Sequence, residues 1–301
     1  MNCEALSFCG WQINVIREEL FFSEAAKERS LEILRRWRAG FRRESSWAQE
    51  VLGVPSLIVR LDCFEENGEL QVYEVEERPS GIGVSSVINL CFSEKLKNIN
   101  KRWPQFKSLI SSERKAHDDE SWLQTIGLDE ALKTDDLLLI RAEPEEEKFH
   151  QFQSRSVSSL VTKGDKSYGL KIGLWEKVGK EDLFNLPWDE GFCLKPLQNS
   201  KCRGVEIYHP TFKKKSGFKK IGGISTKTRI GKVLDRHGEM YLQKFLEPND
   251  CPFCPGNKLA LRVFFGFNIE TGEYEFLGGV WNSRPNLKIH GALDTLMGPL
   301  V

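Results

Sequence analysis

The stretch Arg60–Gly83, RLDCFEENGELQVYEVEERPSGIG, decides how this chain folds. It predicts two short strands joined by a turn, with Asp62 on the first strand and Glu74 and Glu76 on the second. Strand side chains alternate between faces, so Glu74 and Glu76 are expected to point the same way. Neighbouring like charges repel unless a cation lies between them. Carboxylate oxygens grouped in this way suit Mg²⁺.

The same alternation places Val72 on the acidic face, and Tyr73 and Val75 on the opposite face. Arg60 would share the face of Asp62 and could hold a phosphate group. An exposed hairpin whose acids are simply solvated is the alternative. The following Ser80–Gly83 turn contains two glycines, which let a backbone approach a ligand closely.

Composition describes an ordinary soluble chain. It has 301 residues, a formal net charge of +0, 40% hydrophobic and 29% charged residues, which suit one or two domains. Zero net charge gives no reason to expect nucleic acid or a membrane surface as a partner. The first residues show no secretory signal, and no apolar run approaches the roughly 18 residues of a membrane span. We therefore expect a cytoplasmic protein with reduced thiols.

The cysteines offer one close pair, Cys251 and Cys254 in NDCPFCPGNK. Half of a zinc site and a redox pair are both possible, but a structural zinc needs four ligands. A plain loop is the third possibility and the one we favour.

Periodicity predicts an α+β fold. Residues 17–50 and 85–97 are expected to be helical, the second segment opening at a glycine turn where an anion would be favoured. WLQTIGLDEALKTDD suggests a helix, and LLLIRAEP a buried strand. Ser225 is expected to cap a helix that ends at Gly238. LALRVFFGFNIETGEYEFLGGVWNSRP predicts two strands joined by a Thr-Gly turn. Trp175, Trp188 and Trp281 are expected in the core.

Lys195 lies in an otherwise apolar strand, FCLKP, where a lysine either reaches the surface or meets an anion. The order LKPLQNSKCRGV, then a basic loop, then YLQKFLEP, then LRVFF resembles the ATP-grasp fold of carboxylate–amine ligases. In that fold the acids that hold Mg²⁺ usually follow the arginine strand. Here they precede the lysine strand, so the chain resembles the circularly permuted group that contains the glutathionylspermidine synthetase-like ligases.

That resemblance implies a role for each matching residue. The Mg²⁺ ligands would be Asp62, Glu74 and Glu76. Phosphates, adenine and ribose would be bound by Lys195, Lys201, Arg203, Gly204, Gln243, Lys244, Phe245, Leu246 and Glu247. The catalytic cations would be Arg262, Arg60 and Arg284.

The resemblance covers about 51–97 and 188–292 and has departures. Glu76 stands where asparagine is common, and the phosphate loop is poor in glycine. A second phosphate-binding lysine has three candidates, Lys163, Lys171 and Lys177. The basic loop 212–223 would close over the phosphates or remain a solvated surface loop. His290 would meet substrate or complete a turn.

Two α+β subdomains with mainly antiparallel sheets are implied, clasping ATP. Residues 1–125 would hold the N-terminal helices, the acidic hairpin and the following helix. Residues 126–301 would hold the nucleotide-clasping portion, and the two would pack as one unit. The implied activity is ATP- and Mg²⁺-dependent ligation of a small-molecule or peptide carboxylate to an amine. A kinase, or a non-catalytic nucleotide-binding protein, on the same fold is the alternative.

Overall fold

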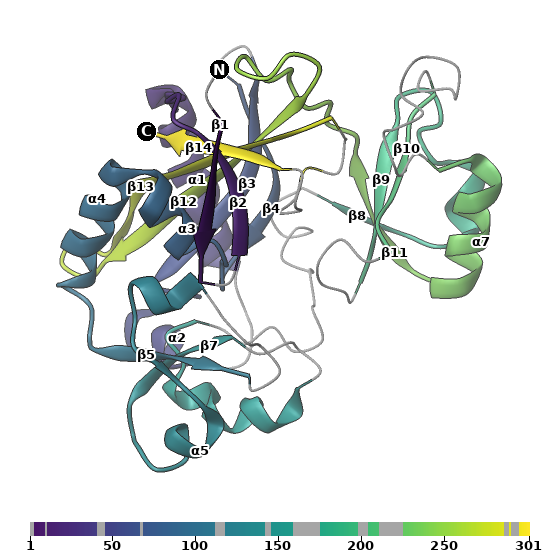
Figure 1. The fold of residues 1–301 in the computed structure, drawn as a ribbon. Coiled ribbons are helices and arrows are strands. Elements are labelled where there is room, and N and C mark those ends of the chain that lie inside the picture. Colours follow the sequence, from purple (N-terminus) through teal and green to yellow (C-terminus); the bar gives the residue numbers. More distant parts are fainter. Residues whose placement is uncertain are drawn as a thin grey trace.

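The computed structural model describes residues 3–9, 11–40, 46–66, 69–111, 118–141, 146–158, 175–197, 204–210, 225–285, 289 and 295–301. Within these ranges the fold is mixed α+β, with sheets of seven, four and three strands (Figure 1). This confirms the α+β class, while the circularly permuted ATP-grasp arrangement stays a prediction.

The seven-stranded sheet joins the two ends of the sequence, in the order β1-β2-β14-β13-β12-β3-β4. Its strands are β1 (Cys3–Phe8), β2 (Trp11–Ile16), β3 (Ile58–Glu66), β4 (Glu69–Glu76), β12 (Lys258–Asn268), β13 (Glu273–Arg284) and β14 (Leu296–Leu300). Strand β12 pairs antiparallel with both β13 and β3, and only β14 and β2 pair in parallel among these described strands. Early and late strands thus share one sheet, while the division into residues 1–125 and 126–301 stays a prediction.

Helices cover both faces of this sheet. Leu34 and Trp37 of α1 (Glu24–Gly40) join the core cluster that contains Trp281. Val84 and Ile88 of α3 (Ile82–Ile88) instead pack with Val280. Since consecutive strand residues point to opposite faces, α1 and α3 lie on opposite sides of the sheet (Figure 1).

The predicted helices are shorter than the sequence suggested. Residues 17–50 contain α1 and the start of α2 (Trp47–Leu52), with Leu20 bridged to Leu300 instead of lying in a helix. The second helical segment is divided at Asn89 into α3 and α4 (Leu90–Asn100). The Asn89 side chain accepts from the Phe92 amide at 3.0 Å, and so caps α4.

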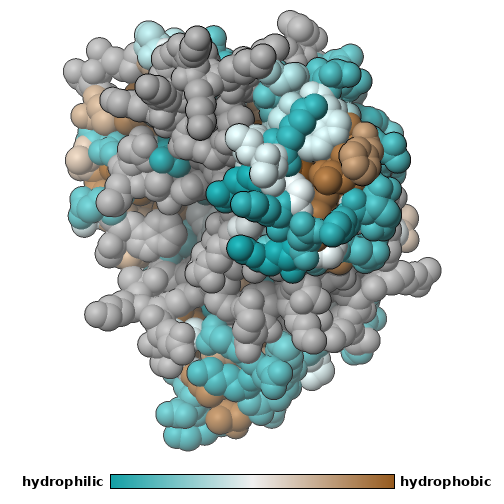
Figure 2. Space-filling view, turned by 90° about the vertical axis from the view of Figure 1, so that its right-hand side faces the viewer, coloured by the Kyte–Doolittle hydropathy of each residue, from teal (hydrophilic) through white to brown (hydrophobic). Residues whose placement is uncertain are grey.

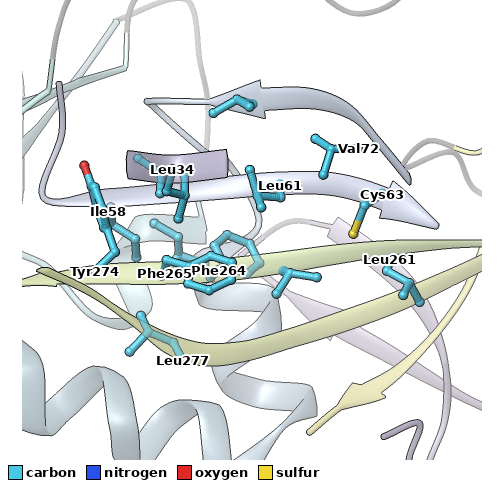
Figure 3. Close-up of a cluster of buried hydrophobic side chains, with 14 of the residues drawn as sticks. Leu34, Ile58, Leu61, Cys63, Val72, Leu261, Phe264, Phe265, Tyr274 and Leu277 are labelled. Atoms are coloured by element: carbon cyan, nitrogen blue, oxygen red, sulfur yellow. The ribbon is translucent and has the colours of Figure 1, made fainter. Parts of the chain in front are cut away.

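A β-bulge changes the hairpin that the alternation predicted. The register of β3 and β4 shifts between Asp62 and Cys63, so that Cys63 pairs with Val72. Val72 therefore lies in the hydrophobic core together with Val75, and Figure 3 shows it next to Cys63 among the core side chains. The prediction that Val72 shares the acidic face was wrong, because an extra residue in one strand reverses the alternation beyond it.

The four-stranded antiparallel sheet β10-β9-β11-β8, together with the helices beside it, forms a part of the molecule that we call the small lobe. Its elements are β8 (Glu176–Val178), the 3₁₀ helix η4 (Lys180–Phe184), β9 (Phe192–Pro196), β10 (Glu206–Tyr208), α7 (Lys227–His237) and β11 (Met240–Lys244). Helix α7 ends at Gly238 as predicted, but its cap is Thr226, whose Oγ1 accepts from the Arg229 amide at 3.2 Å. Ser225, the predicted cap, donates its hydroxyl to Glu206 instead.

The third sheet, β6-β5-β7, is parallel and was not predicted. Its elements are β5 (Phe106–Ile110), the 3₁₀ helix η1 (Asp118–Ser121), β6 (Thr125–Ile126), α5 (Leu128–Ala131), β7 (Leu137–Arg141) and the 3₁₀ helix η2 (Glu147–Arg155). The strand predicted at LLLIRAEP is β7, whereas WLQTIGLDEALKTDD, predicted as a helix, forms the short strand β6 and the short helix α5. Two mainly antiparallel subdomains are therefore an incomplete description.

The described surface is largely hydrophilic where the molecule is viewed from the side of the small lobe, with hydrophobic areas that are small and separate (Figure 2). No helix in the described ranges has the length and apolar character needed to cross a membrane.

Candidate functional site

Arg60 and the hairpin acids form one ion-paired group. The Arg60 guanidinium donates to both Asp62 oxygens, at 2.5 Å from Nε and 2.9 Å from Nη2. Nη2 also lies 3.1 Å from Glu76, and Nη1 donates to the Ser80 carbonyl at 2.8 Å. The register explains this grouping, because Glu76 lies directly across from Arg60, and Glu74 across from Asp62.

Burial and charge act in opposite directions on this arginine. Burial disfavours the charged guanidinium, but Asp62, Glu76 and Glu74 outweigh it, so the pKa of Arg60 is raised above its ordinary value. Arg60 therefore stays charged and offsets the repulsion between the acids that the sequence assigned to a metal ion.

Arg262 extends the same face onto β12. It lies directly across from Asp62, with Nε 4.0 Å from the Asp62 carboxylate. Arg284 is farther along the neighbouring strand β13. It is buried, and its partner across the strand pair β12–β13 is Lys258. The alternation of β13 puts it on the face of Val280, the cross-strand partner of Arg262.

Lys195 brings the small lobe to the hairpin. Its ammonium donates to the carbonyl oxygen of Tyr73 in β4 at 2.9 Å, and lies 4.8 Å from the centre of the Trp175 ring. The Trp175 ring in turn packs against Tyr241, the strand partner of Lys195, with 5.3 Å between ring centres. A buried ammonium with an aromatic face and a carbonyl as neighbours is held in place.

Trp281 is fully buried in the main core, as expected, and Trp188 packs in the small lobe. Trp175 is buried too, but its position under Lys195 was not predicted.

The predicted hinge begins within the last two residues of β11 and continues beyond this strand. Gln243 and Lys244 still belong to the sheet, since they pair with Cys193 and Phe192. The Phe245 amide donates to the Gly191 carbonyl at 3.2 Å, so this amide is already used.

Leu246 and the predicted ribose acid come next. The Glu247 carboxylate lies 3.4 Å from the Lys258 ammonium at the start of β12. His209, next to the predicted hinge, was not predicted from the sequence. Its ring packs edge-on against Phe245, with 5.0 Å between ring centres, and burial lowers its pKa.

Other predicted residues lie elsewhere or outside the described residues. Lys177 pairs with Glu239 at 3.1 Å, and Gly204 has the positive φ of 73° that glycine tolerates. Outside the described residues lie Lys163, Lys171, Lys201, Arg203, His290 and the loop 212–223.

At the start of α3, a carboxylate of the chain itself accepts a hydrogen bond from the helix backbone. The amide of Gly83 donates to the Asp118 carboxylate at 2.9 Å. The chain's own acid thus takes the place that the sequence suggested for an anionic ligand.

The hairpin acids match Mg²⁺ in chemistry but not in their present arrangement. Carboxylate oxygens are the donors that Mg²⁺ prefers. Among the residues that the structure describes, however, no group of three His, Cys, Asp or Glu side chains is arranged to hold a metal. Asp62 and Glu76 instead share the Arg60 guanidinium.

Cys251 and Cys254 are buried thiols in the turn before β12, and neither forms a disulfide. Burial, together with the neighbouring Cys251, raises the pKa of Cys254 to about 11. In the described part of the chain no group of three His, Cys, Asp or Glu side chains is arranged to hold a metal, and the plain loop stays a prediction. A redox role stays untested.

Comparison with known proteins identifies no family. No family model matches the chain, and no curated protein matches it. Among solved structures, a glutathione synthetase-like effector from Globodera pallida is similar at 10% identity over 93% of this chain and 88% of that chain, with a TM-score of 0.42. A putative gamma-glutamylcysteine synthetase from Methylobacillus flagellatus KT is similar at 10% identity over 90% of this chain and 82% of that chain, with a TM-score of 0.46. Similarity at this level carries no conclusion about family or activity.

Proposed function

We propose that the chain is an ATP- and Mg²⁺-dependent ligase that joins a carboxylate to an amine. One observation carries the proposal: Lys195 of the small lobe donates to the Tyr73 carbonyl of the hairpin that carries Arg60 and Asp62. Arg262 of the neighbouring strand β12 lies directly across from Asp62. The cations and carboxylates that phosphoryl transfer requires come together from distant parts of the sequence. The arrangement is that of two lobes with charged groups where they meet.

In the proposed reaction, a carboxylate oxygen of the substrate attacks the γ-phosphorus of ATP, and ADP leaves. The amine then attacks the carbonyl carbon of the acyl phosphate, inorganic phosphate leaves, and the amine loses a proton. Lys195 and Arg262 would bind phosphate oxygens and stabilise the charge that develops on them. Glu247 would accept hydrogen bonds from the ribose.

Mg²⁺, held by Asp62, Glu74 and Glu76, would supply further charge neutralisation on the phosphates. We propose small-molecule or peptide substrates and a cytoplasmic location, with neither nucleic acid nor a membrane as partner.

Nucleotide binding by purified Lys195→Met tests the proposal. We expect its ATP affinity to fall by about tenfold or more, because a charge-assisted contact to phosphate is lost. Lys177→Met is the matched control, since Lys177 also lies in the small lobe but pairs with Glu239. Isothermal titration calorimetry with ATP and Mg²⁺ measures both variants. Equal ATP affinities in wild type, Lys195→Met and Lys177→Met would contradict the assignment of Lys195.

Product analysis separates the alternatives. An amide together with inorganic phosphate supports the ligase, whereas a stable phosphorylated product indicates a kinase. ATP binding without turnover of acids and amines indicates a non-catalytic nucleotide-binding protein. The pairing of Asp62 and Glu76 with Arg60 is what keeps this last alternative open.

A further inference from the structure

Arg60 is enclosed by the oxygens that were predicted to bind a metal. Its side chain is only 5% exposed, and Asp62 is 7% exposed. Each of its three nitrogen positions has an oxygen partner within 3.1 Å. A guanidinium is planar and fits a carboxylate with two parallel hydrogen bonds, so this contact is specific as well as charged.

The backbone holds this guanidinium at the centre of the acids. The pairing of β3 with β4 puts Glu76 directly beside Arg60, and Glu74 beside Asp62. The Ser80 carbonyl, in the turn that follows β4, fixes the far side of the guanidinium. Arg60 therefore cannot leave Asp62 without also breaking the contact with that turn.

A divalent cation would need the same oxygen atoms. Both Asp62 oxygens accept hydrogen bonds from Arg60, so each oxygen has one lone pair fewer to offer a metal ion. Arg262, 4.0 Å from Asp62, adds a second positive charge that would repel the ion. Guanidinium and metal thus exclude each other, at least in part, at Asp62 and Glu76.

We infer that Arg60 is the resident counter-ion of the hairpin acids and competes with a divalent cation for them. The free chain accordingly binds Mg²⁺ or Mn²⁺ weakly, and removal of the guanidinium exposes a latent cation site. The inference rests on the metal ligands of the proposed function, but it requires no nucleotide.

Mn²⁺ binding in the absence of nucleotide tests the competition. The loss of the electron paramagnetic resonance signal of free Mn²⁺ reports binding to wild type and to Arg60→Gln. We expect Arg60→Gln to bind Mn²⁺ at least about tenfold more tightly, because the competing charge at the acids is removed. Adding Asp62→Asn to Arg60→Gln should abolish the gain. Arg35→Gln is the matched control, since Arg35 pairs with Glu273 in an exposed position.

Folding of the variant provides a second readout. Arg60→Gln leaves Asp62 buried without its counter-ion, which destabilises the fold. A cation that binds only the folded state restores stability. We therefore expect Mn²⁺ to raise the unfolding temperature of Arg60→Gln more than that of wild type. If Arg60→Gln does not fold, Arg60→Met replaces it in the binding assay, because methionine also lacks the charge and its flexible side chain fills irregular space.

Two results would overturn the inference. One is a folded variant, Arg60→Gln or the replacement Arg60→Met, that binds Mn²⁺ no more tightly than wild type. The other is a gain that persists when Asp62→Asn is added. Neither result depends on ATP, so a failure of the inference is distinguishable from a failure of Lys195→Met to weaken ATP binding.

Discussion

At the scale of single residues, two buried arginines fix the turn after the hairpin. Arg60 donates to the Ser80 carbonyl at 2.8 Å, and Arg141 of β7 donates to the Arg78 carbonyl at 2.9 Å. Arg141 also makes two hydrogen bonds to Asp119, at 2.6 and 2.8 Å. The parallel sheet and the hairpin are therefore linked through one turn, and each link depends on a carboxylate that orients its arginine.

The Asp119–Arg141 pair should be essential for stability. Asp119 is 0% and Arg141 3% exposed, so Asp119→Asn leaves a buried charge without its partner. We expect the free energy of unfolding to fall by about 3–5 kcal/mol. Urea unfolding followed by circular dichroism gives this value.

Glu273→Gln is the control for that measurement. It removes a partner from an exposed pair, Arg35–Glu273, and should cost no more than about 1 kcal/mol. Similar losses of unfolding free energy in Asp119→Asn and Glu273→Gln would show that burial does not increase the contribution of the Asp119–Arg141 pair to stability.

At the scale of elements, close backbone approaches explain which glycines matter. A Cβ at Gly83 in α3 would lie 1.9 Å from the Asp118 carbonyl oxygen. A Cβ at Gly231 in α7 would meet only the Leu183 side chain, at 3.6 Å. A side chain larger than glycine therefore does not fit at position 83. At position 231 there is room for one, and glycine only lowers the stability of the helix.

Gly83→Ala and Gly231→Ala should have opposite effects. The first forces α3 and η1 apart, and we expect it to destabilise the fold by about 1–3 kcal/mol. The second removes a helix glycine at ordinary contact distance, and should stabilise by up to about 1 kcal/mol. Thermal unfolding of both variants measures the two changes. Equal changes in both variants would mean that the contact with Asp118 relaxes without cost.

The elements also show what the sequence could and could not predict. The acidic hairpin and the strands joined at Thr271–Gly272 were found because alternation and turn residues are local signals. The bulge that buries Val72 was not found, because it depends on how β4 fits the core. The five-residue strand β7 was found from its unbroken apolar run, whereas β5 was missed because Lys107 and Ser108 interrupt its run, and β6 because it has only two residues.

The candidate site was predicted only in part, for a related reason. Arg60 was correctly placed on the face of Asp62 by alternation. Its bidentate ion pair and the contact of Lys195 with the Tyr73 carbonyl depend on distances in the folded chain. Residue order indicated which groups could meet, and the packing of the lobes determines which ones do.

At the scale of the whole molecule, the small lobe has a core cluster of its own, although Tyr241 of β11 belongs to the core of the seven-stranded sheet. Leu194, Ile230 and Leu234 belong to the small-lobe core, whereas Leu61 belongs to the core of the seven-stranded sheet. Contacts between the lobe and the sheet include the hydrogen bond from Lys195 to Tyr73. Units that bury their own cores can open independently of one another.

The two cores should therefore respond separately to a cavity. Leu234 and Leu61 are both 0% exposed, so Leu234→Ala and Leu61→Ala each cost about 2–5 kcal/mol in their own core. We expect Leu234→Ala to speed amide hydrogen exchange in β9 and β11 while β12 and β13 remain protected. Leu61→Ala should speed exchange in β3, β12 and β13. Exchange followed by mass spectrometry resolves these segments. If Leu234→Ala speeds exchange equally in β9 and β12, the lobes unfold as one cooperative unit, and the two cores do not respond separately.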